Sequence, residues 1–90
     1  MKAVNLVELD YRGKQRVMAT YVAVDDEIKI MSDNPHWREL AKEIADEGVR
    51  VGSKRYSLKD GIKFLKALSM EYDGKKFWAT EVFDYEGVLP

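Results

Sequence analysis

The chain has 90 residues, of which 46% are apolar and 34% charged, and its formal net charge is −1. One α+β domain spanning residues 1–90 is expected, because independently folding cores usually need about 50 to 200 residues. The absence of cysteine excludes disulfides, thiolate metal ligands and a cysteine nucleophile. No apolar run of secretory or membrane-spanning length occurs, so the expected location is the cytoplasm.

Three strands are predicted in the first third of the chain. Residues 3–11 are rich in β-branched and apolar side chains and lead to Gly13, which can adopt the positive φ of a tight turn. Residues 15–24 are apolar on nearly both faces, which is typical of a central strand, and residues 27–31 alternate between polar and apolar. The simplest arrangement is a three-stranded antiparallel meander.

A helix is predicted over residues 35–47. Asn34 is a residue type that caps helices, and Pro35 suits the first helical position because no amide hydrogen is needed there. Gly48 can supply the left-handed residue just beyond the helix end. The apolar side chains at helical spacing are Trp37, Leu40, Ala41, Ile44 and Ala45.

A second helix is predicted over residues 58–72, after a brief strand or extended link at residues 49–51 and a polar loop at residues 52–55. One face of this helix is apolar and another is basic. The apolar face consists of Leu58, Ile62, Leu65, Leu68 and Tyr72. The basic face consists of Lys59, Lys63 and Lys66.

Residues at both ends of the second helix indicate where it begins and ends. Ser57 is a candidate cap, with Asp60 in the capping-box position. Gly61 costs up to about 1 kcal/mol relative to alanine, so either the backbone approaches closely there or the helix is weakly formed at its start. The pair at residues 73–74 is either the helix exit or a hairpin turn, and the helical stripe favours an exit near Tyr72.

Together these elements predict an α+β fold with an antiparallel sheet of about four strands. The fourth strand is expected over residues 76–84, which are dense in aromatic and β-branched side chains. Both helices are expected to cover one face of the sheet. The sequence leaves the strand order open.

Patterns for catalysis or metal binding are weak. His36 is the only histidine, and no nucleophile or carboxylate is linked to it in sequence, so a surface role is expected. Residues 25–27 are acidic but lack the spacing and glycine of a calcium loop, and residues 52–54 lack the spacing of a phosphate loop. The sequence therefore predicts no catalytic residue, cofactor or metal. An enzyme would need carboxylates or lysines from two subunits.

The charge distribution is the main functional signal. Residues 49–76 carry eight Lys or Arg against three acidic residues, whereas the rest of the chain carries seven against thirteen. Such an asymmetry can focus a positive potential on one side of a small domain. The predicted interaction surface consists of Lys54, Arg55, Lys59, Lys63, Lys66, Lys75 and Lys76.

The leading hypothesis is a non-enzymatic interaction or regulatory module. Its basic helix face would meet an acidic protein surface or the acidic half of a second copy, as in a homodimer. The alternative is nucleic-acid binding by residues 50–76 with Tyr56 or Trp78 as stacking partner, although a pI near 5.8 disfavours it. Membrane docking is not expected, because the core needs the apolar stripe of the second helix.

Overall fold

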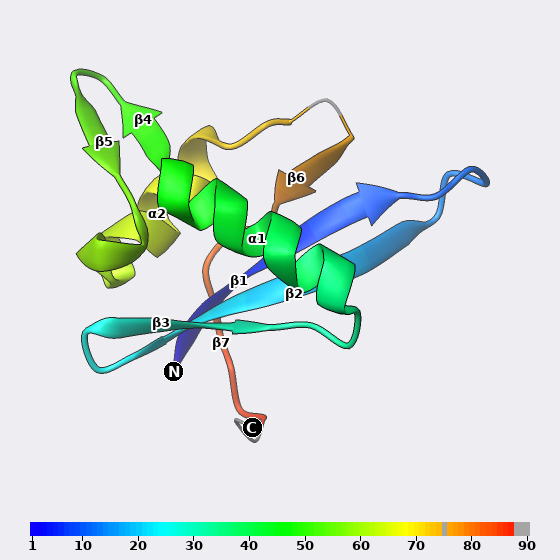
Figure 1. The fold of residues 1–90 in the computed structure, drawn as a ribbon, viewed down its shortest axis with the longest axis horizontal. Coiled ribbons are helices and arrows are strands. Elements are labelled where there is room, and N and C mark those ends of the chain that lie inside the picture. The colour runs from blue at the N-terminus through cyan, green and yellow to red at the C-terminus, as the bar shows by residue number, and fades with distance from the viewer. Residues whose placement is uncertain (75, 88–90) are drawn as a thin grey trace.

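The computed structural model describes residues 1–74 and 76–87. Five strands form one antiparallel sheet: β1 (Lys2–Leu9), β2 (Gln15–Val24), β3 (Glu27–Met31), β6 (Phe77–Ala79) and β7 (Phe83–Asp84). The other elements are α1 (Pro35–Glu47), β4 (Val49–Val51), β5 (Lys54–Tyr56), the 3-10 helix η1 (Leu58–Asp60) and α2 (Ile62–Glu71). The sheet order is β3-β2-β1-β6, and β7 also pairs with β1 (Figure 1). The predicted α+β class and the meander are confirmed.

A bulge in β2 adjusts how the central strands face the core. Leu6 pairs with Ala19 whereas Val7 pairs with Val17, so Met18 is an extra residue on β2. Because a bulge interrupts the alternation of side chains, Met18 and Ala19 both join the core cluster. The predicted central position of this strand is confirmed, since β2 lies between β3 and β1.

The core lies between the helices and one face of the sheet. Tyr21 on β2 and Phe64 on α2 meet edge to face with ring centroids 5.6 Å apart. The Tyr21 hydroxyl donates a hydrogen bond of 2.7 Å to the backbone carbonyl of Ala41, which links β2 to α1. Phe64 was outside the predicted apolar stripe. The remaining core residues are Val4, Leu6, Met18, Ala19, Ala45, Val49, Leu65, Ala67 and Leu68.

The ends of α1 follow the predicted signals. The Asn34 side chain accepts hydrogen bonds from the amides of His36 and Trp37 at 2.9 and 3.3 Å. At the other end, Gly48 adopts a φ of 83° and its amide donates to the carbonyl of Ile44 at 2.9 Å. Both prediction and structure therefore give residues 35–47.

The predicted helix over residues 58–72 is interrupted at its start. Gly61 has φ 58° and ψ −125°, a conformation that ends η1 before α2 begins. A Cβ at this position would lie 3.2 Å from the backbone oxygen of Asp26, so the backbones approach closely. The Ser57 amide donates to the Asp60 carboxylate at 2.7 Å, so this cap stabilises η1 rather than α2.

The exit of α2 combines the two arrangements considered for residues 73–74. The helix ends at Glu71, and the amide of Tyr72 donates to Leu68, which confirms the predicted end near Tyr72. Asp73 then forms an isolated antiparallel bridge with Trp78, so the chain turns back immediately after the helix.

The single strand predicted over residues 76–84 is wrong, because β6 and β7 are separate. Leu6 pairs with Ala79, yet Ala3 pairs with Phe83, so the register shifts by one residue between them. At the break, the Asn5 amide donates to the side-chain oxygen of Thr80 at 3.0 Å instead of to a backbone carbonyl. The Thr80 hydroxyl thus takes the place of one backbone carbonyl as the hydrogen-bond acceptor between the strands.

The polar loop predicted at residues 52–55 is also wrong. Lys54–Tyr56 forms β5, which pairs with β4 across a two-residue turn at Gly52 and Ser53. Gly52 has φ 63°, as tight hairpin turns require. Val49 is buried in the core and Tyr56 packs against the core, so burial against α2 stabilises a hairpin too short to be stable alone.

We expect Gly61→Ala to lower the free energy of unfolding by about 1–3 kcal/mol, because side chains at such backbone angles are strained. The new Cβ would also meet Asp26. Urea unfolding followed by circular dichroism measures the loss. Gly13→Ala is the matched control, since its φ is also positive but nothing lies within 4 Å of its Cβ. Equal losses in both variants would show that the contact with Asp26 contributes nothing.

The Tyr21 hydroxyl makes stability depend on alkaline pH. Burial, with a smaller contribution from Tyr72, raises the pKa of Tyr21 far above its ordinary value of 10.0. Above about pH 10 the Tyr21 hydroxyl loses its proton in the unfolded chain but keeps it in the folded chain. The contribution of Tyr21 to the free energy of unfolding is therefore complete below about pH 10 and is lost as the pH rises further. We expect Tyr21→Phe to flatten this fall in melts recorded between about pH 8 and 11. A slope identical to that of the parent chain would contradict the assignment.

Candidate functional site

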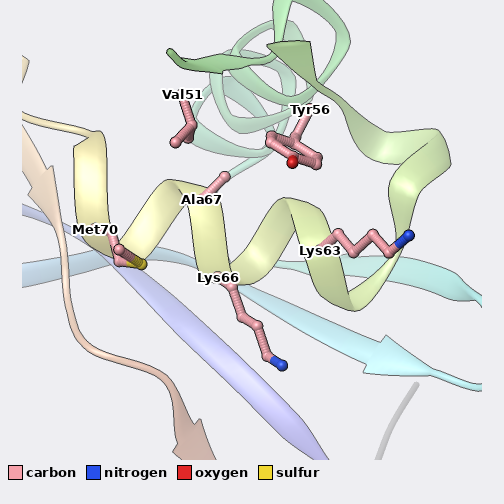
Figure 2. A pocket seen from close by; sticks show the side chains of 6 residues that line it. All are labelled: Val51, Tyr56, Lys63, Lys66, Ala67 and Met70. Atoms are coloured by element: carbon pink, nitrogen blue, oxygen red, sulfur yellow. The ribbon is translucent and has the colours of Figure 1, made fainter. Parts of the chain in front are cut away.

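A groove of about 300 Å³ lies between the β4–β5 hairpin and α2 (Figure 2). Two of its side chains come from the hairpin and four from the helix. Apolar and aromatic groups line most of it, and two lysines border it on the helix. The lining residues are Val51, Tyr56, Lys63, Lys66, Ala67 and Met70.

The spacing of residues on each element explains how the groove forms. Residues directly opposite on an antiparallel pair share a face, and Val51 is paired with Lys54. On the helix, Lys63, Ala67 and Met70 follow one another at steps of four and three, so they lie along one face. Figure 2 shows them in this order along α2, below Tyr56.

Small and large side chains divide the groove into floor and walls. Ala67 is 5% exposed and forms the floor, where its single methyl group leaves room beside the hairpin. Tyr56 forms one wall, and the Lys54 ammonium lies 5.8 Å from the centroid of its ring. Met70 is 75% exposed at one end. Lys54 therefore adds a third cation at the edge of the groove.

The structure separates the predicted basic surface into distinct parts. Lys54, Lys63 and Lys66 gather around the groove. Arg55 instead reaches α1, where its Nη1 donates to the backbone oxygen of Glu47 at 2.8 Å. This carbonyl is in the last turn of α1, where carbonyls lack helical partners. Arg55 thus has a structural role.

The other predicted cations lie away from the groove or outside the described chain. Lys59 is in η1 and borders a hollow that Asp26 and Glu27 also line. Lys76 is exposed beyond the end of α2, and Lys75 lies outside the described residues. The predicted row of three lysines is divided between two elements, with Lys59 in η1 and Lys63 and Lys66 in α2.

The cations at the groove have no acidic partner. Within the described residues the ion pairs are Lys2 with Asp84 at 2.8 Å and Lys29 with Glu27 at 3.4 Å. Lys63 is also the second residue of α2, whose first turn contains no acidic residue. A cation at a helix N-terminus is disfavoured by the helix dipole. The arrangement places lysines beside an apolar surface, although Lys63 also borders a second hollow that Asp26 and Asp60 line.

The aromatic candidates for base stacking lie on different sides of the sheet. Trp78 pairs with Val7, and paired residues share a face. Leu6, the neighbour of Val7, belongs to the helix-facing core, so Val7 and Trp78 face the opposite way. Tyr56 is consequently the one predicted stacking residue beside the lysines.

Other site types find little support in the described part of the chain. No group of three or more His, Asp or Glu side chains there is placed to hold a metal ion. His36 is exposed in the first turn of α1. None of the described helices combines the length and the apolar character needed to cross a membrane.

The groove could not be predicted without the β4–β5 hairpin, which forms one of its sides. The alternation of residues 49–51 and 54–56 around Gly52 and Ser53 is a weak hairpin signal that could have been used. Met70 lies outside the predicted apolar stripe. Its exposed position beside the groove was therefore not predicted from the sequence.

Comparison with known protein families, with curated proteins and with solved structures found no significant match to this chain. The groove and the charges around it are therefore the guide to its function.

Proposed function

We propose that this chain is a small non-enzymatic interaction module that holds an acidic protein segment against Lys54, Lys63 and Lys66. The observation that supports this function is the coincidence of an apolar groove with cations that have no ion-pair partner among the described residues. Protein interfaces combine an apolar centre with a polar rim. The groove and its lysines have this composition.

The lysines are suited to guiding a partner more than to binding it tightly. Exposed ion pairs contribute only about 0.2–1 kcal/mol each, whereas complementary charges speed association and select the orientation of the partner. We therefore expect weak, salt-sensitive binding of the kind found in regulatory contacts. A cytoplasmic location, expected from the sequence, is part of the same proposal.

The acidic segment can belong to another protein or to a second copy of the chain. The outer face of α1 is mainly acidic, and none of its carboxylates forms an ion pair with another described residue. A contact between this face and the groove of a second copy would join two different surfaces, so it would extend head to tail. The acidic residues on α1 are Glu39, Glu43, Asp46 and Glu47.

Nucleic-acid binding is the alternative that uses the same cations. Tyr56 favours it, because its ring lies beside Lys54 and could stack on a base. A titration with single- and double-stranded oligonucleotides at two salt concentrations distinguishes the alternatives, since phosphate binding weakens steeply with salt. Tight low-salt binding of oligonucleotides, without binding of acidic peptides, would replace the proposed function.

The double variant Lys63→Glu, Lys66→Glu tests the proposed function. We expect it to weaken binding of a fluorescent polyglutamate peptide, measured by anisotropy at low salt, by about tenfold, which corresponds to roughly 1.4 kcal/mol. The fold should persist, because both side chains are exposed and a glutamate near the start of α2 suits the helix dipole.

The matched control is Lys14→Glu, Lys42→Glu, which changes the net charge equally at exposed positions away from the groove. The control should bind within about twofold of the parent chain, since only non-local charge has changed. Equal losses in the two double variants would show that net charge, not the groove, governs binding. Retention of full affinity by the Lys63, Lys66 variant would remove the proposal.

A further inference from the structure

We infer that the groove recognises an acidic segment through one bulky apolar side chain, aliphatic or aromatic, that is flanked by carboxylates. This inference rests on the proposed function and adds the chemistry that selects one acidic partner from others. It follows from three properties of the groove: its size, the character of its walls, and the distance between its floor and its cations.

The groove is large enough for such a side chain. Its volume is about 300 Å³. Engineered apolar cavities of about 150 Å³ already bind benzene, and small-molecule sites begin at about 300 Å³. One leucine or phenylalanine side chain therefore fits.

The walls suit an apolar occupant. Val51 and Ala67 present aliphatic groups, and Tyr56 presents its ring. Met70 is 75% exposed, although a methionine gains by burial. Methionine is also flexible and polarizable, so it can adjust to side chains of different shape. An apolar side chain in the groove would remove Met70 and Tyr56 from water together.

The lysines favour a partner that carries acidic residues next to this apolar side chain. Lys63 and Ala67 are four residues apart on α2, which corresponds to about 6 Å along the helix axis. Side chains on one face of an extended strand repeat every two residues, or about 6.6 Å. In an extended partner, an Asp or Glu two residues from the apolar side chain would thus lie at Lys63. Two further cations lie nearby, because Lys66 also lines the groove and Lys54 lies beside the Tyr56 ring.

Three labelled peptides of equal length test the inference against the folded chain. The first has glutamates with a central leucine, the second has alanine in place of leucine, and the third is polyglutamate. We expect the leucine peptide to bind about tenfold more tightly than the alanine peptide, because burial of a leucine contributes this much. Its binding should also persist at salt concentrations that release polyglutamate.

Two variants connect the gain to the groove. Ala67→Met would fill the floor, and Met70→Ser would remove an exposed wall without disturbing the core. Each should abolish most of the advantage of the leucine peptide while binding of polyglutamate persists. Leu9→Ser is the matched control, because Leu9 is also an exposed apolar residue but lies on β1, away from the groove. It should keep the full advantage.

A methyl NMR spectrum gives a direct reading of the contact. The chain has four methionines. The methyl signal of Met70 should shift with the leucine peptide, while those of Met1, Met18 and Met31 stay in place. Equal binding of the leucine and alanine peptides, or no shift at Met70, would overturn the inference but leave the proposed function intact. Failure of all three acidic peptides to bind would remove the proposed function as well.

Discussion

The buried contacts of Tyr21 hold the two helices on the sheet, and the groove depends on them. Its hydroxyl bonds to the backbone of Ala41 in α1, and its ring meets Phe64 in α2. Once α1 is held in place, Gly48 begins the hairpin at the helix end, where a Cβ would lie 2.5 Å from the backbone oxygen of Tyr56. Tyr21 thus helps to position both sides of the groove, the β4–β5 hairpin and α2.

Charge and shape act on different aspects of the surface. In the proposed function, the exposed lysines around the groove would each contribute little to affinity, but together they would favour acidic segments over neutral or basic ones. The apolar floor would then distinguish one acidic segment from another. Lys59 is separated from the groove because it lies in η1, where it borders hollows that Asp26 also lines.

Local signals predicted most of the elements, and tertiary contacts account for the differences. The cap at Asn34 and the glycine at residue 48 determined α1 to the residue, because both act on hydrogen bonds within a few positions. Gly61 indicated a weakly formed helix start. The backbone that approaches it belongs to Asp26, far away in sequence, so the break between η1 and α2 could not be predicted from local signals. The division of the last strand depends on Thr80 meeting Asn5, which lies at the opposite end of the chain.

The sequence by itself determined the α+β class, the first three strands, α1 and the concentration of positive charge in residues 49–76, since periodicity, caps and composition are local properties. Only the tertiary structure decided which cations lie beside the groove. Lys54 joins Lys63 and Lys66 because a short hairpin folds onto α2, while Arg55 turns to the end of α1. The physical reason is that a groove is formed by the space between elements, and no single stretch of sequence encodes that space.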